Sequence, residues 1–192
     1  MLYSELQCSE AIHKAVERMG FAEMTEIQEK TIPVMLAARD VIAKAPTGTG
    51  KTCAFGIPVA EHIDPEKKYP QAVIMAPTRE LAQQIAEELT ELTYFMPEVQ
   101  VACVYGGANM EKQARRLAEG CQIVVATPGR LMDHYKHHSI DLAHVTQVVL
   151  DEADEMLNMG FYKDVRHIIE LMKARKSLSM FSATISREVM DI

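Results

Sequence analysis

The sequence predicts an α/β fold, a mostly parallel sheet with helices on both of its faces. Short apolar runs alternate with longer stretches of helical periodicity along the whole chain. The runs are unbroken rather than apolar–polar alternations, which is typical of strands that helices cover on both sides. They lie at 41–45, 72–76, 101–105, 123–126, 148–151 and 178–182. Alternation of strands and helices requires crossover connections and therefore favours parallel pairing.

The helical stretches carry start and stop signals. Apolar residues at positions 12, 15, 16 and 19 form one stripe, with Ser9 placed to cap its start and Gly20 to end it. A second stripe lies within 81–92, and further helices are predicted over 109–120 and 161–174. In a sheet of this kind, functional loops gather at the carboxyl ends of the strands.

Composition limits the class of protein. The 192 residues suit a single domain, predicted here over 1–192, and 48% hydrophobic with 24% charged residues is ordinary globular usage. The 27 acidic side chains exceed the 20 lysines and arginines, and the net charge of −7 argues against bulk electrostatic attachment to nucleic acid. Because there is no long apolar run or signal-peptide pattern, we expect a cytoplasmic chain without a membrane partner. The four cysteines have no close pairing and are expected to be reduced core thiols.

A glycine-rich loop after the first predicted strand is typical of phosphate binding. Residues 45–52 read APTGTGKT, with an alanine in place of the first glycine of the P-loop pattern. Gly48 and Gly50 allow backbone N–H groups to turn inward, and the following helix presents the positive end of its dipole. Lys51 can reach the β- and γ-phosphates, and the Thr52 hydroxyl can ligate Mg²⁺. The alternative is a strand–turn–helix connection whose glycines serve geometry alone.

An acidic tetrapeptide, DEAD at 151–154, follows the fifth predicted strand. Beside a P-loop, Asp151 can hold Mg²⁺ through water, and Glu152 can polarise the water that attacks the γ-phosphate. Taken alone, such a tetrapeptide is most often an exposed helix start, favoured by the helix dipole. Paired with the phosphate loop it predicts phosphoryl transfer, with Lys51, Asp151 and Glu152 as catalytic residues.

The two motifs together resemble those of the DEAD-box ATP-dependent RNA helicases of superfamily 2, and the other motifs of that family follow in order. The resemblance covers essentially the whole chain and implies the family's N-terminal RecA-like domain, which has a P-loop NTPase fold. Within 1–28, Phe21, Thr25 and Gln28 resemble the adenine-recognising Q motif, with Met24 where proline is usual and Tyr3 where phenylalanine is common. The ATP-binding residues implied are Phe21, Thr25, Gln28, Thr47, Gly48, Thr49, Gly50, Lys51 and Thr52, and those implied for Mg²⁺ are Thr52 and Asp151.

The Q-motif side chains have chemistry that suits adenine. The Gln28 amide offers one acceptor and two donors, enough to pair with both N6 and N7 of the base, and Phe21 can stack on the ring. The alternatives are an exposed helix residue for Gln28 and a core anchor for Phe21.

The resemblance also implies an RNA-facing surface and a coupling motif. The RNA-facing residues are Pro77, Thr78, Arg79, Gly106, Gly107, Thr127, Pro128, Gly129 and Arg130. Guanidinium groups match phosphate oxygens and glycines permit close backbone approach, so recognition is expected to be independent of base sequence. The alternative is that the two arginines cap helices or pair with Glu80 and Asp133. Asp154, Ser182 and Thr184 are implied to link ATP hydrolysis to strand separation.

An enzyme that hydrolyses ATP to remodel or unwind RNA is therefore expected, working with a second RecA-like domain that does not follow Ile192 here. We expect this chain to be a monomer that binds nucleotide and Mg²⁺ but shows little RNA-stimulated turnover by itself. Two other hypotheses remain open, a nucleotide-dependent adaptor without catalysis and a different P-loop enzyme such as a GTPase. The histidines at 134, 137 and 138 are expected at a solvated helix end.

Overall fold

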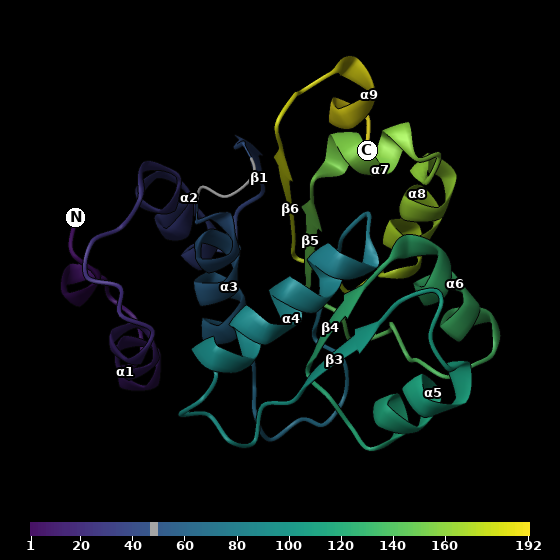
Figure 1. Ribbon diagram of the computed structural model, residues 1–192, viewed down its shortest axis with the longest axis horizontal. Coiled ribbons are helices and arrows are strands. Elements are labelled where there is room, and N and C mark those ends of the chain that lie inside the picture. Colours follow the sequence, from purple (N-terminus) through teal and green to yellow (C-terminus); the bar gives the residue numbers. More distant parts are fainter. Residues whose placement is uncertain (47–49) are drawn as a thin grey trace.

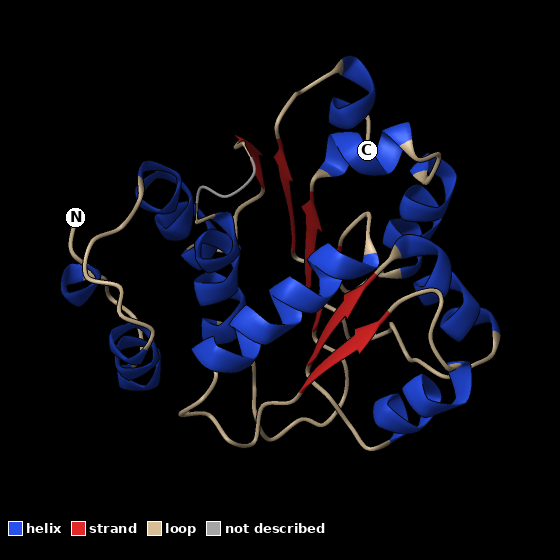
Figure 2. Ribbon diagram, in the orientation of Figure 1, coloured by secondary structure: helices blue, strands red, loops and turns tan. Residues whose placement is uncertain are grey.

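One parallel sheet with helices on both faces makes up the fold (Figures 1 and 2). The structure is a computed structural model that describes residues 1–46 and 50–192. Its strands are β1 (Val41–Lys44), β2 (Ala72–Met75), β3 (Val101–Val104), β4 (Ile123–Ala126), β5 (Gln147–Asp151) and β6 (Ser177–Ser182). They stand in the order β1-β6-β5-β2-β4-β3, and every pairing is parallel. The predicted fold class is confirmed.

The helices form two layers. One face is covered by η1 (Tyr3–Glu5), α1 (Glu10–Arg18), α2 (Glu26–Leu36), α3 (Lys51–Glu61) and α4 (Arg79–Leu92). The other is covered by α5 (Met110–Ala118), α6 (Pro128–Lys136), α7 (Ala153–Asn158), α8 (Tyr162–Leu171) and α9 (Arg187–Met190). Alternate strand residues serve the two cores, Ile74 the first and Val73 the second. Among the described residues, no helix is long and apolar enough to cross a membrane.

The predicted helix signals correspond to real caps. Ser9 Oγ accepts the Ile12 N–H at 3.4 Å at the start of α1, and Gly20 follows that helix with a φ of 85°. Asn109 Oδ1 accepts the Lys112 N–H at 3.0 Å at the start of α5. The helix predicted over 161–174 is shorter in the structure and ends at Leu171.

The prediction that helices cover the strands on both sides is right for the centre of the sheet and wrong for its edges. Every residue of β2, β4 and β5 is buried. In contrast, β1 and β3 are edge strands, and the Ile42 side chain in β1 is 44% exposed. An apolar run of four residues does not reveal strand order, so the sequence could not distinguish an edge strand from a central one.

The cysteines are free, as expected. Two are buried and two partly buried, and burial raises the pKa of Cys53 to about 12 and those of Cys8, Cys103 and Cys121 to about 11. At neutral pH these thiols are therefore protonated and poorly nucleophilic.

Candidate functional site

Segments far apart in the sequence meet at the carboxyl ends of β1, β6 and β5, which are neighbours in the sheet (Figure 1). The glycine-rich loop follows β1, Ser182 ends β6 and Asp151 ends β5. Of the predicted phosphate-binding residues, Gly50, Lys51 and Thr52 are described, whereas Thr47, Gly48 and Thr49 lie outside the described residues. The loop and the acidic tetrapeptide converge, with Lys51 Nζ 3.1 Å from Asp151 Oδ1.

The Lys51–Asp151 ion pair is almost completely removed from solvent. The two side chains are 6% and 0% exposed. Burial raises the pKa of Asp151 to about 6, and the nearby Lys51 ammonium opposes that rise. Within the described residues, no well-aligned hydrogen bond satisfies the ammonium or either carboxylate oxygen. Buried charges with unused hydrogen-bonding capacity are costly, and phosphate oxygens with a divalent cation are groups that would satisfy them.

Gly50 connects the glycine-rich loop to the Gln28 side chain. It precedes α3 with φ 76° and ψ 19°, a left-handed conformation that favours glycine. Its carbonyl accepts a hydrogen bond from Gln28 Nε2 at 2.9 Å, and a Cβ at position 50 would lie 2.8 Å from that nitrogen. Glycine therefore permits both the backbone turn and the close approach of the amide. The first N–H groups of α3 follow directly, and helix N-termini bind anions.

Thr52, a predicted metal ligand, lies buried in the first turn of α3. Its hydroxyl interacts with the carboxylate of Glu88 on α4 and acts to lower the pKa of that group. Burial raises the pKa of Glu88, and the polar side chains of Thr52 and Gln84 oppose that rise. Sequence reasoning missed Glu88, because an acid on an amphipathic helix gives no signal that separates it from its solvated neighbour Glu87.

Glu152 occupies a strained turn between β5 and α7. It has φ 53° and ψ 54°, a left-handed conformation that costs a residue with a side chain about 1–3 kcal/mol. The turn carries the chain directly from the buried Asp151 into the first turn of α7. Such strain concentrates at functional positions, and here it lies at the predicted catalytic carboxylate.

Hydrogen bonds join the coupling residues to the acidic tetrapeptide. Asp154 Oδ2 accepts from the Thr184 N–H at 3.1 Å and from the Thr184 hydroxyl at 2.9 Å. The Ser182 hydroxyl accepts the Asp154 N–H at 3.1 Å and donates to the Thr184 carbonyl at 2.6 Å. Burial acts to raise the pKa of Asp154, but the bonds from Thr184 and Ser182 outweigh it and hold that pKa below its usual value. The end of β6 and the start of α7 are thus linked in both directions.

The residues predicted to form the Q motif line one pocket, which Gly50 also lines. The pocket has a volume of about 320 Å³, and Phe21, Thr25, Gln28 and Gly50 are among its walls. Thr25 caps α2 in a reciprocal capping box with Gln28. Gln28 is 3% exposed and Phe21 is 45% exposed, so both alternatives considered from the sequence, a solvated glutamine and a core phenylalanine, are wrong. Both side chains line the pocket, with Phe21 partly exposed to solvent and Gln28 buried.

The predicted RNA-facing residues lie at the carboxyl ends of the other three strands. Pro77, Thr78 and Arg79 follow β2, Gly106 and Gly107 follow β3, and Thr127, Pro128, Gly129 and Arg130 follow β4. Gly107 has a φ of 83°, and a Cβ at Gly106 would meet nothing within 4 Å. The backbone at Gly106 and Gly107 is therefore exposed, and the Arg79 guanidinium lies close to Gly107.

The two predicted phosphate-binding arginines differ in their surroundings. Arg79 is exposed, and its guanidinium lies 4.8 Å from the centre of the Tyr105 ring. Arg130 has a 13% exposed side chain, donates to the Ala108 carbonyl at 3.0 Å and lies 3.8 Å from Asp133. The alternative of internal pairing is thus observed for Arg130, whereas Arg79 has a guanidinium that remains accessible.

Gln113 is the centre of a buried network that the sequence did not indicate. Its amide oxygen accepts from Arg130 Nη1 at 3.2 Å and contacts His134 Nε2 at 3.0 Å, while its nitrogen donates to the Tyr105 carbonyl at 3.0 Å. The expectation of a solvated His134 is wrong, because this side chain is fully buried. A polar residue in a short amphipathic helix looks the same in the sequence whether it faces solvent or a buried network.

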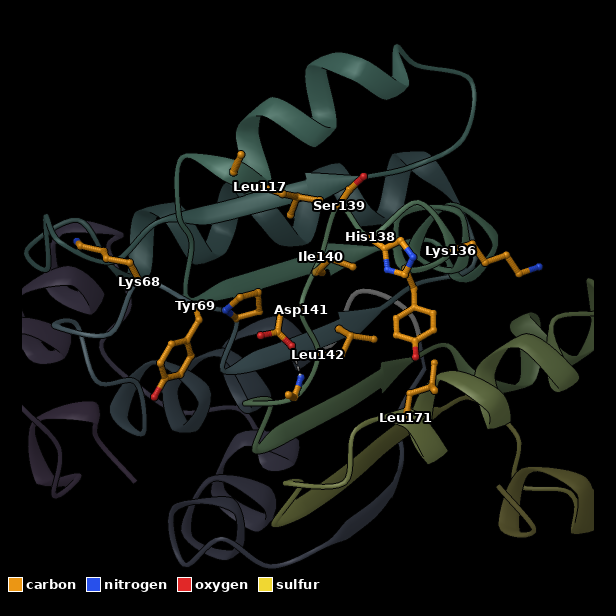
Figure 3. A pocket seen from close by; sticks show the side chains of 14 residues that line it. Lys68, Tyr69, Leu117, Lys136, His138, Ser139, Ile140, Asp141, Leu142 and Leu171 are labelled. Atoms are coloured by element: carbon orange, nitrogen blue, oxygen red, sulfur yellow. Dashed lines mark hydrogen bonds between the residues drawn. The ribbon is translucent and has the colours of Figure 1, made fainter.

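A larger cavity lies at the amino ends of the strands, on the opposite side of the sheet from the glycine-rich loop (Figure 3). Its volume is about 780 Å³, and its walls include Tyr69, Lys136 and Leu142. Tyr69 and Leu142 precede β2 and β5, so the cavity is at the amino ends of the strands, away from the glycine-rich loop. None of the predicted site residues that the structure describes lines it.

A glycine-rich segment leads from an edge strand into a buried helix, and Lys51 at the start of that helix contacts an aspartate two strands away. These features define a P-loop NTPase domain of the RecA-like type. The family model described as DEAD/DEAH box helicase matches residues 25–192, and the chain belongs to that family.

Individual relatives agree with this assignment. The chain is 51% identical over 182 residues to a protein named ATP-dependent RNA helicase CshA from Listeria monocytogenes, covering 95% of this chain and 35% of that protein. It is 43% identical over 190 residues to ATP-dependent RNA helicase DeaD from Escherichia coli, covering 99% of this chain and 30% of that protein. The crystal structure of a DEAD box protein from Methanococcus jannaschii matches with a TM-score of 0.92 and 40% identity, over 100% of this chain and 52% of that one. The chain therefore spans about a third of the length of these curated relatives.

Proposed function

We propose that this chain is the ATP- and RNA-binding domain of a DEAD-box RNA helicase, and that it hydrolyses ATP to remodel RNA when joined to a second RecA-like domain. The observation that carries the proposal is the buried contact between Lys51 and Asp151, 3.1 Å apart, beside the Gln28–Gly50 hydrogen bond. We assign the pocket at Gln28 to the base, the glycine-rich loop to the phosphates and Asp151 to the metal ion, and these two contacts support the assignment because they link the three parts.

Nucleotide binding follows from the groups in these three parts. Phe21 stacks on the base, Gln28 donates to it, and Gly50 and Lys51 bind the phosphates, with Thr47, Gly48 and Thr49 completing the loop. Lys51 and Asp151 neutralise each other here, so a triphosphate competes with Asp151 for the ammonium. Thr52 and Asp151 would hold Mg²⁺, and two protein oxygen ligands suit an ion bound largely by phosphates and water. The ion, when bound, neutralises charge on the transferred phosphoryl group.

Hydrolysis and its coupling are assigned to the acidic tetrapeptide. Glu152 orients the attacking water and accepts its proton, which requires only a positioned carboxylate. Asp154 is bonded to Thr184, and Ser182 to Asp154, so a displacement at α7 is transmitted to the segment after β6. The second RecA-like domain would supply the charges that complete the site; an arginine added in trans is worth about 10³–10⁵ in rate in related systems.

RNA would bind across the carboxyl ends of β2, β4 and β3. Arg79 contacts a phosphate, and the exposed backbone at Gly106 and Gly107 lies against the sugar–phosphate chain, with Gly129 beside it. Pro77, Thr78, Thr127 and Pro128 shape this surface. Backbone contacts carry no base information, so binding is independent of sequence, and the net charge of −7 predicts weak binding by the chain alone.

The test is a titration of this chain with ATP and ADP, with and without Mg²⁺, repeated for Lys51→Ala and Thr52→Val. We expect both variants to weaken nucleotide binding at least tenfold, and Thr52→Val to remove most of the dependence on Mg²⁺. Thr90→Val, an exposed threonine on α4, is the matched control and should bind like the parent chain. Unchanged affinity in both loop variants would refute the proposal. Strong RNA-stimulated turnover by residues 1–192 alone would refute the need for a second domain.

A further inference from the structure

The amide of Gln28 is held by three groups of the protein, and their chemistry fixes its orientation. Its oxygen accepts the Thr25 N–H at 3.0 Å and also the Tyr3 hydroxyl proton, while its nitrogen donates to the Gly50 carbonyl at 2.9 Å. A backbone N–H can only donate and a carbonyl can only accept, so the amide cannot be reversed. Burial raises the pKa of Tyr3, so at neutral pH the phenol keeps the proton that it donates.

These contacts leave Gln28 with little capacity for a ligand. A carbonyl oxygen accepts two hydrogen bonds, and both positions on Gln28 Oε1 are filled by Thr25 and Tyr3. One amide proton is used by Gly50, and among the described residues the other has no acceptor. In this arrangement Gln28 can donate to a ring nitrogen or carbonyl of a purine, but it cannot accept from the exocyclic amine of adenine.

Tyr3 is held over the pocket by the backbone around it. The Tyr3 N–H donates to the Ala22 carbonyl at 3.0 Å, and the Met24 N–H donates to the Met1 carbonyl at 2.9 Å. The Tyr3 ring is 4% exposed, stacks against Phe21 with ring centres 6.4 Å apart, and lines the same pocket as Gln28. A proline at position 24 would lack the N–H that Met24 donates. The segment that carries Tyr3 is therefore hydrogen-bonded to the chain at both Ala22 and Met24.

We propose that Tyr3 is a specificity-determining residue whose hydroxyl competes with the adenine amine for Gln28 Oε1, and so weakens discrimination between adenine and other purines. The inference rests on the proposed nucleotide binding. Adenine gains its second hydrogen bond to Gln28 only by displacing Tyr3, whereas guanine, which presents a carbonyl at that position, uses the remaining N–H and displaces nothing.

The experiment compares the parent chain with Tyr3→Phe, titrating each with ADP, GDP and the diphosphate of purine riboside, which lacks the exocyclic amine. Tyr3→Phe should bind ADP about three to ten times more tightly, the value of one net hydrogen bond, while the other two affinities stay within about twofold. Tyr94→Phe, which changes an exposed tyrosine outside the pocket, should alter none of them. In a Gln28→Ala background, Tyr3→Phe should no longer favour ADP.

The possible results distinguish a failure of this inference from a failure of the proposed function. Affinities for all three nucleotides that move together would show that Tyr3 only supports the pocket, and an ADP affinity that is unchanged or weaker in Tyr3→Phe would show that the hydroxyl does not compete. Either result overturns this inference and leaves the proposed function standing. If neither chain binds any of the nucleotides, the proposed function itself is wrong and the inference falls with it.

Discussion

The polar groups at the carboxyl ends of the strands differ between the two halves of the sheet. At β1, β6 and β5 the polar groups are buried and bonded to one another, as in Lys51–Asp151 and Gln28–Gly50. At β2, β4 and β3 the groups that face outward are an exposed arginine and open glycine backbone. The first half holds charges that a ligand must separate, and the second offers a surface that a ligand can contact without rearrangement.

Ligand specificity is therefore expected in the first half, and tolerance of substitutions in the second. Desolvated, directional groups are worth more and discriminate more sharply, because an unsatisfied partner is costly. Exposed charges act through screened electrostatics and depend on salt. Substitutions in the first half should therefore cause large, ligand-specific losses, and those in the second half small losses that salt can mimic.

The largest effect is expected for Glu152→Gln in the intact protein. The substitution keeps size and shape but removes the proton acceptor, so ATP turnover should fall at least about a hundredfold while nucleotide affinity changes less than about threefold. Steady-state hydrolysis and an equilibrium titration measure the two quantities. Glu155→Gln, on an exposed acid of α7, should keep normal turnover. If hydrolysis persists in Glu152→Gln, another residue acts as the general base.

A smaller effect is expected for Arg79→Ala. Losing one phosphate contact should weaken RNA binding severalfold for any base sequence and reduce the salt slope by about 0.7. Arg115→Ala, on an exposed arginine of α5, is the control.

Arg130→Ala sharpens the contrast between the two arginines. It should lower the free energy of unfolding by about 1–3 kcal/mol, because it breaks charged hydrogen bonds to Ala108 and Gln113. Denaturant unfolding and RNA titration of both variants distinguish the two arginines, because Arg130→Ala should lose stability and Arg79→Ala should lose RNA affinity. Equal losses of RNA affinity with no loss of stability in Arg130→Ala would place both on the RNA surface.

The smallest effect is a pH dependence of stability that His134 carries. Its Nε2 contacts an amide oxygen that can only accept, so the proton is on Nε2, and Nδ1 is buried without a hydrogen bond among the described residues. Burial, and then the charge of Arg130, lowers the pKa of His134, although Asp133 opposes them. The unfolded chain therefore binds the proton more readily, and the stabilisation present above about pH 6.5 is lost as the pH falls.

Thermal unfolding at pH 7.5 and 5.5 tests this assignment. The parent chain and the exposed-site control His167→Gln should lose the same stability on acidification. His134→Gln should start about 1 kcal/mol less stable and lose less between the two pH values. An equal loss of stability between pH 7.5 and 5.5 in all three chains would show that His134 does not cause the pH dependence.

The sequence predicted the fold class, the helix caps and the convergence of the loop with Asp151, because each depends on local pattern or on motifs at strand ends. It did not predict which strands are edges, that His134 is buried against Gln113, or that Arg130 is paired internally while Arg79 is exposed. Those outcomes depend on which side of a helix or strand meets a distant neighbour, and short apolar runs and isolated polar residues do not carry that information. Nor could it reveal that the Tyr3 hydroxyl reaches Gln28, since the two are brought together by the turn after α1.

The most direct test is to follow backbone amide NMR signals of this chain while adding ADP with Mg²⁺, and separately a single-stranded RNA. We expect the nucleotide to shift signals at 25–28, 50–53 and 151–154, and RNA to shift those at 79, 106–107 and 129. Nucleotide-induced shifts confined to the β2, β4 and β3 edge, or to the cavity around Tyr69 and Leu142, would contradict this expectation.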